Sequence, residues 1–379
     1  MSRQPSIWLT ALSHLKSETP KHPVLYFAPA TLQATVQQFV DGFDGLVTYA
    51  VKANDSRVVL ENLVACGISA FDVASPAEMH ALRAVSSDAV MHYNNPVRAR
   101  DEIAEAVALG VRSYSVDAPH EFEKLRAQVD PKGIEISVRL RLPVEGAAYH
   151  FGTKFGADVE QAVALLRMVK EAGFTPSMTF HPGTQCASPS AWSTYVATCA
   201  EVSKEAGVKL ARLNVGGGFA ANRGVAPDLN AIFATIHRAV QNAFGDAAPA
   251  LVCEPGRAMV AEAFTLATRV KSIREDGAVY LNDGIYGALS EAPSIGVPDR
   301  ISTVRADGTS HKGAPMKRIV FGPTCDSIDQ LPDPLALPAD LAEDDYVLFS
   351  GMGAYSLATV TRFNGYGQID LVTVQRAGL

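Results

Sequence analysis

The sequence of 379 residues has no apolar run of the roughly 18 residues that a membrane-spanning helix needs. Residues 1–21 are polar, so we also expect no secretory leader. Positive charge is scarce: 33 Lys and Arg stand against 40 Asp and Glu, and the net charge is −7. This negative net charge does not indicate binding to nucleic acid or to an anionic membrane. The five cysteines are odd in number and widely spaced, which argues against a disulfide framework or a zinc site and is typical of reduced thiols in the cytoplasm.

The middle of the chain alternates short β-branched runs with alanine-rich segments of helical period, which predicts strands alternating with helices. The expected strands are residues 46–51, 68–73, 90–93, 112–116, 134–140, 176–180, 212–215 and 250–253. The expected helices are residues 56–65, 76–84, 99–109, 119–128, 159–172, 190–206 and 227–244. Eight such strands favour an α/β fold with a (β/α)8 TIM-type barrel. An open doubly wound sheet is the rival, because periodicity cannot show closure.

After about residue 264 the helical period fades, and short strand-like runs are separated by Gly- and Pro-rich turns. These runs are residues 264–271, 278–281, 317–321, 346–349 and 369–374. They predict a C-terminal antiparallel β domain that residues 24–27 could join, and a Pro-rich surface loop at 331–338. We therefore expect a barrel domain over residues 28–264 and a β domain formed by residues 1–27 and 265–379.

Polar residues or glycines stand at the end of seven of the eight expected strands or directly after it. They are Lys52, Asp72, Asn94 and Asn95, Arg139, His181, Gly216–Gly218 and Glu254. In a βα barrel the carboxyl ends of the strands converge on one mouth, where the chemistry takes place. Packing alone would have to produce this placement by repeated coincidence.

Three consecutive glycines, Gly216–Gly218, allow backbone N–H groups to approach an anion. Barrels often hold a phosphate with the loops after strands seven and eight, where Arg257 adds a charged fork. Lys52 follows an apolar run, and partial desolvation there favours the uncharged, nucleophilic amine. With Glu254 as an acid for a pyridine nitrogen, these features suit pyridoxal phosphate (PLP). Each feature also has a plainer interpretation. The glycines could form a tight turn, Lys52 could be a solvated surface lysine, and Glu254 could belong to an exposed salt bridge.

Six longer motifs contain these residues or follow them. They are Tyr-Ala-Val-Lys-Ala-Asn at 49–54, Phe-Asp-Val-Ala-Ser at 71–75, Gly-Gly-Gly-Phe at 216–219, Glu-Pro-Gly-Arg at 254–257, Gly-Pro-Thr-Cys-Asp-Ser at 322–327 and Met-Gly-Ala-Tyr at 352–355. With them the chain resembles the PLP-dependent group IV decarboxylases of the alanine-racemase-like fold (fold type III), from about residue 24 to residue 374. The last two motifs are most similar to the ornithine decarboxylase branch.

The resemblance implies PLP as the cofactor and assigns the residues around it. Lys52 would hold the aldehyde covalently, Glu254 would pair with the pyridine nitrogen, and His181 would stack on the ring. The implied cofactor-binding residues are Lys52, Asp72, Arg139, His181, Thr184, Gly216, Gly217, Gly218, Glu254, Gly256, Arg257 and Tyr355. Taken without the resemblance, His181 could equally be a structural histidine before the Pro182-Gly183 turn.

The resemblance also implies an obligate homodimer with shared active sites. Cys325 of one subunit would protonate the carbanion in the partner's site, and Asp326 would bind the distal ammonium of the substrate. Lys154 and Asp329 match a cross-subunit ion pair of the family. Without the motif, Cys325 could be a small buried residue and Asp326 a turn residue.

The chain departs from the ornithine enzymes after Tyr286, which the resemblance places at the substrate. The position of a second amine-binding aspartate is occupied by Ile295, and Glu291 lies nearby as a substitute ligand. We expect decarboxylation of a basic L-amino acid, with L-ornithine as substrate and putrescine, the entry to polyamine synthesis, as product. One methylene changes binding by only about 1–3 kcal/mol, so dual lysine/ornithine, arginine and diaminopimelate specificities stay open. A non-catalytic relative similar to the antizyme inhibitors and an amino-acid racemase are the more distant alternatives.

Overall fold

The computed structural model describes residues 7–148 and 152–378 of the chain. These residues form two compact units. One consists of residues 36–220 and 227–256, and we call it the barrel unit. The other consists of the chain up to Thr35, residues 221–226 and the chain from Arg257 onwards, and we call it the β unit. The expected domain boundaries at residues 28 and 264 stay a prediction, because compactness does not show which part folds independently.

Parallel strands build the barrel unit. They are β2 (Leu46–Val47), β3 (Tyr49–Ala50), β4 (Ala70–Val73), β5 (Val90–Tyr93), β6 (Ser113–Val116), β7 (Glu135–Leu140), β8 (Thr175–Phe180), β9 (Arg212–Asn214) and β10 (Ala250–Cys253). Their order in the sheet is β2-β10-β9-β8-β7-β6-β5-β4-β3. Only Thr48 separates β2 from β3, so one continuous chain segment forms both ends of the sheet and closes it. The predicted barrel is confirmed, and the open sheet is excluded.

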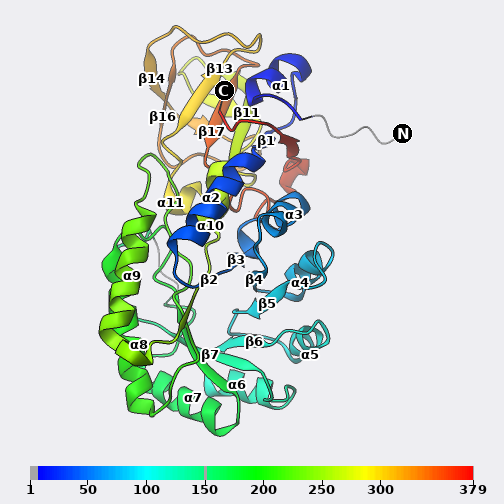
Figure 1. Ribbon diagram of the computed structural model, residues 1–379. Coiled ribbons are helices and arrows are strands. Elements are labelled where there is room, and N and C mark those ends of the chain that lie inside the picture. Colours follow the sequence, from blue (N-terminus) through cyan, green and yellow to red (C-terminus); the bar gives the residue numbers. More distant parts are fainter. Residues whose placement is uncertain (1–6, 149–151, 379) are drawn as a thin grey trace. The chain divides into compact units, whose positions relative to one another are not determined.

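Helices follow the barrel strands in the predicted alternation and lie on the outside of the barrel (Figure 1). They are α3 (Arg57–Ala65), α4 (Pro76–Arg83), α5 (Arg100–Ala108), α6 (Pro119–Arg126), α7 (Val159–Glu171), α8 (Pro189–Ala206) and α9 (Leu229–Phe244). Helix α2 (Pro29–Gly42) precedes β2, and the short 3-10 turns η1 (Val51–Ala53) and η2 (Gly245–Ala247) follow β3 and α9. Side-chain caps set several starts: Ser75 and Asp158 each accept from a backbone N–H in the first turn of the following helix.

An aromatic cluster fills the space between the barrel and its outer helices. Trp192 of α8 is fully buried, stacks on Phe219 with ring centroids 5.1 Å apart, and donates its indole N–H to the carbonyl of Val215. Phe39 and Phe233 contact the same Phe219 ring edge-on. This cluster holds α2, α8 and α9 against the segment that follows β9.

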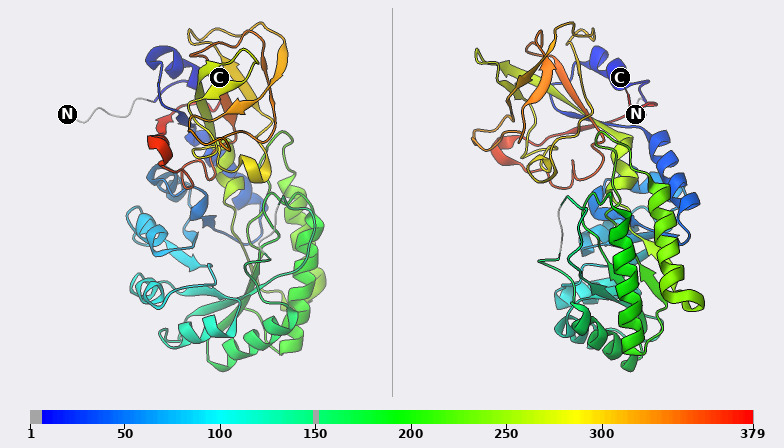
Figure 2. Two further views of the ribbon diagram at one scale, coloured as in Figure 1. Left: turned by 180° about the vertical axis from the view of Figure 1, so that it is seen from behind. Right: turned by 90° about the vertical axis from the view of Figure 1, so that its left-hand side faces the viewer.

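The β unit contains a separate, mainly antiparallel sheet in the order β13-β17-β11-β1-β18, seen from two sides in Figure 2. Its elements are α1 (Ala11–Glu18), β1 (Val24–Phe27), α10 (Arg257–Val260), η3 (Ala261–Ala263), β11 (Phe264–Ile273), β12 (Val279–Leu281), α11 (Ala292–Ile295), β13 (Ile301–Val304), β14 (Pro315–Arg318), β15 (Val320–Phe321), β16 (Leu335–Pro338), β17 (Tyr346–Ser350), η4 (Phe363–Gly365) and β18 (Asp370–Thr373). As predicted, β1 joins this sheet, pairing antiparallel with β11. It also pairs parallel with β18 at the far end of the chain.

The sequence interpretation was wrong for part of the β unit. Residues 335–338, expected in a surface loop, form strand β16, which pairs with β14. Pro334, directly before the strand, and Pro338, its last residue, hid this strand, and an edge strand tolerates proline at both positions. Strand β13 carries only partly buried residues at its start and gave no clear alternation. The single strand expected at 317–321 is two strands, β14 and β15. No helix among the described residues is long and apolar enough to cross a membrane.

The barrel closure predicts a small, local stability effect at Thr48. Its backbone N–H and its hydroxyl both donate to the carbonyl of Cys253, at 2.9 Å each. Thr48→Val keeps the shape and removes one buried hydrogen bond, so we expect a loss of about 1 kcal/mol in the free energy of unfolding. The measurement is the shift of the urea midpoint. Thr194→Val, which removes an exposed hydroxyl contact on α8, is the matched control, and an equal shift in both variants would contradict the assignment.

Candidate active site

The amine of Lys52 lies beside a buried acid at the mouth of the barrel. Lys52 is in η1, directly after β3, and β3 pairs with β4 so that Ala50 faces Asp72. This register brings Lys52 Nζ to 3.0 Å from Asp72 Oδ2. The Lys52 side chain is 42% exposed, whereas Asp72 is 3% exposed. The carboxylate therefore fixes an amine that a reactant can still reach.

Glu254 is a buried carboxyl group held by two amides. It is 7% exposed, and its Oε1 accepts from Asn94 Nδ2 at 2.5 Å and from Asn214 Nδ2. Burial and the nearby Asp72 raise the pKa of Glu254 to about 7, while Lys52, Asn214 and Arg139 oppose the rise. The group can therefore hold or release a proton near neutral pH.

The sequence alone gives the two asparagines no role. Asn94 follows an expected strand, and Asn214 lies within another. Their position offers a signal, because both amides stand at the carboxyl end of a largely buried strand, from which other barrel residues reach the mouth.

His181, after β8, is held as a neutral ring. Burial lowers its pKa well below the usual value, and the positive charges of Arg139 and Lys52 act in the same direction. Its Nδ1 accepts a hydrogen bond from the backbone N–H of Gly183 at 3.1 Å, as an unprotonated nitrogen does. Arg139 extends from β7, with its guanidinium 5.2 Å from the centre of the Phe155 ring. A flat, uncharged imidazole suits the stacking role expected for His181.

The three glycines at 216–218 are needed for close packing within the chain. An added Cβ would lie 2.1 Å from the carbonyl oxygen of Phe180 at Gly216, 2.7 Å from that of Glu254 at Gly217, and 2.3 Å from that of Gly183 at Gly218. Gly216 and Gly218 also have positive φ angles of 71° and 82°. These contacts explain the glycines without a ligand, so phosphate contact stays a prediction for them.

Two further expected phosphate ligands belong to the barrel unit. Thr184 is 9% exposed and lies in the loop after β8, where its carbonyl accepts from Ala148 N at 2.8 Å. Gly256 packs closely enough that a Cβ would lie 3.1 Å from the Cβ of Ala53. The loop after β10 thus lies against η1, which carries Lys52.

In the β unit, Arg257 and Glu291 form a close pair. Arg257 Nη1 donates to Glu291 Oε2 at 2.6 Å, and Nη2 donates to Oε1 at 2.5 Å. The guanidinium also lies 4.9 Å from the centre of the Tyr355 ring. The expected contact of Glu291 with a substrate ammonium stays a prediction, and this pairing does not favour it.

Tyr286 and Asp326, both expected at the substrate, lie together in the same unit. The Tyr286 hydroxyl donates to Asp326 Oδ2 at 2.5 Å, and the N–H of Ile328 donates to Oδ1. These two bonds lower the pKa of Asp326. The neighbouring Cys325 is exposed, and its backbone N–H donates to Asn364 Oδ1. This corner therefore presents an ionised carboxylate and a thiol side by side in the chain.

The proposed intersubunit ion pair finds less support in the geometry. Asp329 is 1% exposed, and its oxygens accept from the backbone N–H groups of Ile285 and Thr324 and from the Thr324 hydroxyl. Lys154 is exposed in the barrel unit, with its amine 4.9 Å from the Phe155 ring centre. A pair between subunits stays a prediction, and it requires a lysine to reach an acid already bonded within its own chain.

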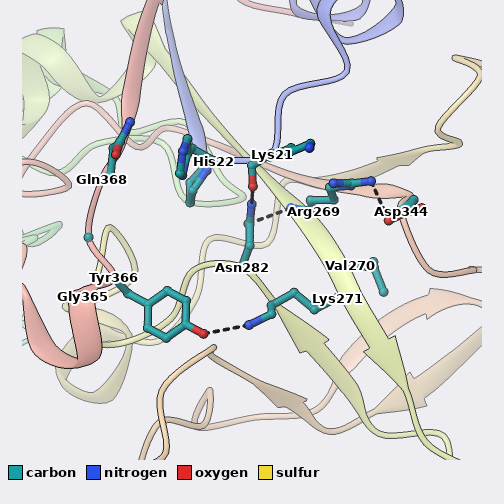
Figure 3. Close-up of a pocket in the computed structure, with 12 residues that line it drawn as sticks. Lys21, His22, Arg269, Val270, Lys271, Asn282, Asp344, Gly365, Tyr366 and Gln368 are labelled. Carbon is teal, nitrogen blue, oxygen red and sulfur yellow. Dashed lines mark hydrogen bonds and ion pairs between the residues drawn. The ribbon is translucent and has the colours of Figure 1, made fainter.

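A cavity of about 360 Å³ in the β unit is distinct from these residues (Figure 3). Its wall includes Lys21, Arg269, Lys271 and Tyr366, and Lys271 donates to the Tyr366 hydroxyl at 3.0 Å. Among the described residues that line it, none is an expected site residue. The lining of this cavity therefore has no part in the expected active site.

Comparison with known proteins decides the family. Residues 30–261 match the family model of the pyridoxal-dependent decarboxylases, pyridoxal binding domain. The chain belongs to this family. PLP is its cofactor, as the motifs predicted.

Relatives and solved structures agree. Lysine/ornithine decarboxylase of Selenomonas ruminantium is 34% identical over 84% of this chain and 81% of its own length. A chloroplastic ornithine decarboxylase of Nicotiana glauca is 32% identical over 86% of this chain and 77% of its own. A variant of SrLDC solved in complex with PLP superimposes with a TM-score of 0.85 at 29% identity, over 96% of this chain and 94% of that one.

Residues of the barrel unit fit this cofactor. The reachable amine of Lys52 can bond to an aldehyde, and the buried carboxyl of Glu254, with its raised pKa, can share a proton with a ring nitrogen. The neutral His181 supplies a flat partner for an aromatic ring. All three side chains come from the same end of the barrel.

The raised pKa of Glu254 predicts a specific pH dependence of stability in the cofactor-free protein. Below about pH 4.5 the carboxyl is protonated in both the folded and the unfolded chain. As pH rises towards 7, only the unfolded chain releases the proton, so the free energy of unfolding falls; above 7 the loss is constant. A rise from 4.5 to about 7 corresponds to about 3 kcal/mol. Glu254→Gln should therefore gain stability relative to the parent between about pH 4 and pH 8, measured by urea unfolding.

Glu201→Gln, at an exposed position of α8, is the control for this measurement. The difference in the free energy of unfolding between this variant and the parent should be the same at pH 4 and at pH 8. If the difference for Glu254→Gln were equally independent of pH, Glu254 would not be the group whose ionisation opposes folding.

Proposed function

We propose that the protein is a cytoplasmic decarboxylase that converts L-ornithine to putrescine and carbon dioxide, as a step of polyamine synthesis. The observation that carries the substrate class is the carboxylate of Asp326, ionised and fixed by the Tyr286 hydroxyl. A fixed anion beside Cys325 suits an amino acid with a cationic side chain. The five unpaired cysteines support the location, because free thiols persist in a reducing compartment.

Residues of this chain would hold the cofactor and control protons around it. When bound, PLP supplies an aldehyde and a ring that takes up the electron pair left by the departing carbon dioxide. Lys52 would hold the aldehyde through its amine, which Asp72 orients. Glu254 holds a proton at the ring nitrogen, while Asn94 and Asn214 keep its carboxyl aligned. His181 would cover the ring, and Arg257, Tyr355 and Gly216–Gly218 are the residues that would hold the phosphate.

Cys325 completes the reaction as the proton donor. Loss of carbon dioxide leaves an electron pair at the α-carbon, and the thiol proton of Cys325 moves to that carbon. The thiol is exposed on the chain, so a reactant can reach it. The resulting thiolate takes up a proton from water before the next turnover.

The enzyme would act as a homodimer with shared sites. Cys325 and Asp326 belong to the β unit, whereas Lys52 and Glu254 belong to the barrel unit. A complete site needs both sets of groups, and the family resemblance assigns them to different subunits. Each active site would thus combine Lys52 of one chain with Cys325 of its partner.

Lysine is the second candidate substrate, because the Selenomonas ruminantium relative carries both amino acids in its name. The position of the second amine-binding aspartate holds Ile295, which ends α11. One ammonium ligand fewer relaxes the demand on side-chain length. Purified holoenzyme should therefore be compared by kcat/KM on ornithine, lysine, arginine and diaminopimelate, with carbon dioxide and the amine product quantified. Absence of turnover on all four would refute the proposed function.

Asp326→Asn should lower kcat/KM for the preferred amino acid by about 30-fold or more, because removing one partner of a close charge pair costs about 2–5 kcal/mol. The amide oxygen of asparagine can still accept from the Ile328 N–H, and its amide N–H can donate to the Tyr286 hydroxyl oxygen, so the fold should be retained. Asp333→Asn, in an exposed loop of the same unit, is the control. Equal kinetics in both variants would place amine recognition elsewhere.

Mixing inactive subunits tests the shared site. Lys52→Ala and Cys325→Ala homodimers should each be nearly inactive. After subunit exchange, a heterodimer contains one site with both residues intact, so activity should return to about a quarter of the wild-type value in a statistical mixture of twofold dimers. No recovery, with heterodimers demonstrated by mass, would mean that each chain builds its own site.

A further inference from the structure

Glu291 binds the guanidinium of Arg257 through two parallel hydrogen bonds, a geometry that fixes a guanidinium firmly. Both carboxylate oxygens accept, one from Nη1 at 2.6 Å and one from Nη2 at 2.5 Å. Two parallel hydrogen bonds of this kind set the plane as well as the position of the guanidinium. The side chains are 9% and 24% exposed, so solvent weakens the pair less than it would on an open surface.

Tyr355 supports the same guanidinium from its flat side. The ring centre lies 4.9 Å from Arg257 Cζ, within the range of a cation–π contact. The backbone of Tyr355 has φ +63°, a left-handed conformation that is uncommon for an aromatic residue. The chain thus holds an unfavourable conformation at the residue whose ring lies against Arg257. Glu291 restrains the guanidinium through two hydrogen bonds, and the Tyr355 ring adds a contact with its central carbon.

A second arginine explains why a negative charge is needed here. Arg223 donates to the carbonyl of Gly296 at 2.5 Å, and its pKa is lowered by burial and by the charge of Arg257, while Glu291 counteracts this. Both arginines and Glu291 line a cavity of about 20 Å³, room for about one water molecule. Two guanidiniums and one carboxylate line this cavity, and Asp299 adds a second negative charge that acts on Arg223 from outside the lining. The cavity wall itself therefore carries more positive than negative charge, which favours a phosphate over the ammonium group of a substrate.

We propose that Glu291 is a positioning residue for the cofactor phosphate, and not a ligand of the substrate amine. It holds Arg257 in one orientation against the repulsion of Arg223, so that the guanidinium is already aligned when the phosphate binds. The inference rests on the proposed function of Arg257 at the phosphate. It assigns Glu291 an effect on cofactor affinity and none on the recognition of the amino-acid side chain.

The test measures cofactor retention and needs no turnover. Glu291→Gln holoenzyme is dialysed against a series of PLP concentrations, and bound cofactor is read from its visible absorbance. We expect the Kd for PLP to rise about tenfold, the size of loss that outer partners of ligand-binding groups cause. The Kd for pyridoxal, which has no phosphate, should stay within about twofold. At saturating PLP, the KM for the amino acid should also stay within about twofold.

The matched control is Glu262→Gln. Glu262 forms the same two-bond pair with Arg300 in the same unit, at 3.0 and 2.7 Å. This variant should leave both Kd values unchanged. If Glu291→Gln does not fold, Glu291→Asp keeps the charge, shortens the reach and gives the same measurement. Unchanged or tighter PLP binding, or a KM raised more than tenfold at saturating PLP, would overturn the assignment. Failure of the wild-type holoenzyme to decarboxylate any amino acid would refute the proposed function but leave this comparison valid.

Discussion

Closure of the barrel by one short segment is the constraint on which the reactive mouth depends. Residues 46–50 pair with β10 through β2 and with β4 through β3. The chain that follows, with Lys52, is therefore fixed between the strand that ends at Glu254 and the strand that carries Asp72. An open sheet would separate these two strands by its full width. Closure thus turns three distant sequence positions into neighbours without any contact specific to a ligand.

Burial at this mouth then decides the charge states. A carboxyl group removed from water holds its proton more tightly, and Asp72 adds to the effect at Glu254. The same removal from water, with two positive neighbours, keeps His181 neutral. Lys52 stays reachable because it lies in η1, beyond the last residue of its strand. Position, more than residue type, therefore makes Glu254 an acid that can share a proton, His181 a neutral ring and Lys52 an accessible amine.

Two sets of charges in the β unit bear on the proposed function: one negatively charged group and one pair of positively charged groups. Asp326, ionised through two donated hydrogen bonds, suits a cation. Arg257, paired with Glu291, and Arg223, whose charge both of them influence, suit an anion. In the proposed function, the first set would recognise the amino-acid side chain and the second set would hold the cofactor phosphate. This assignment also explains why an acidic residue close in sequence to Tyr286 need not act on the substrate.

The sequence by itself determined the strand and helix order of the barrel, because short runs rich in apolar residues alternate with amphipathic helices, some of which begin at a side-chain cap. It also determined the family and cofactor, since motifs such as the one around Lys52 are local. It did not determine β16, whose prolines disguise an edge strand, nor the amides of Asn94 and Asn214 on Glu254, nor the partner of Glu291. Those pairings join residues 34 to 160 positions apart, and only tertiary structure brings such residues within hydrogen-bonding distance.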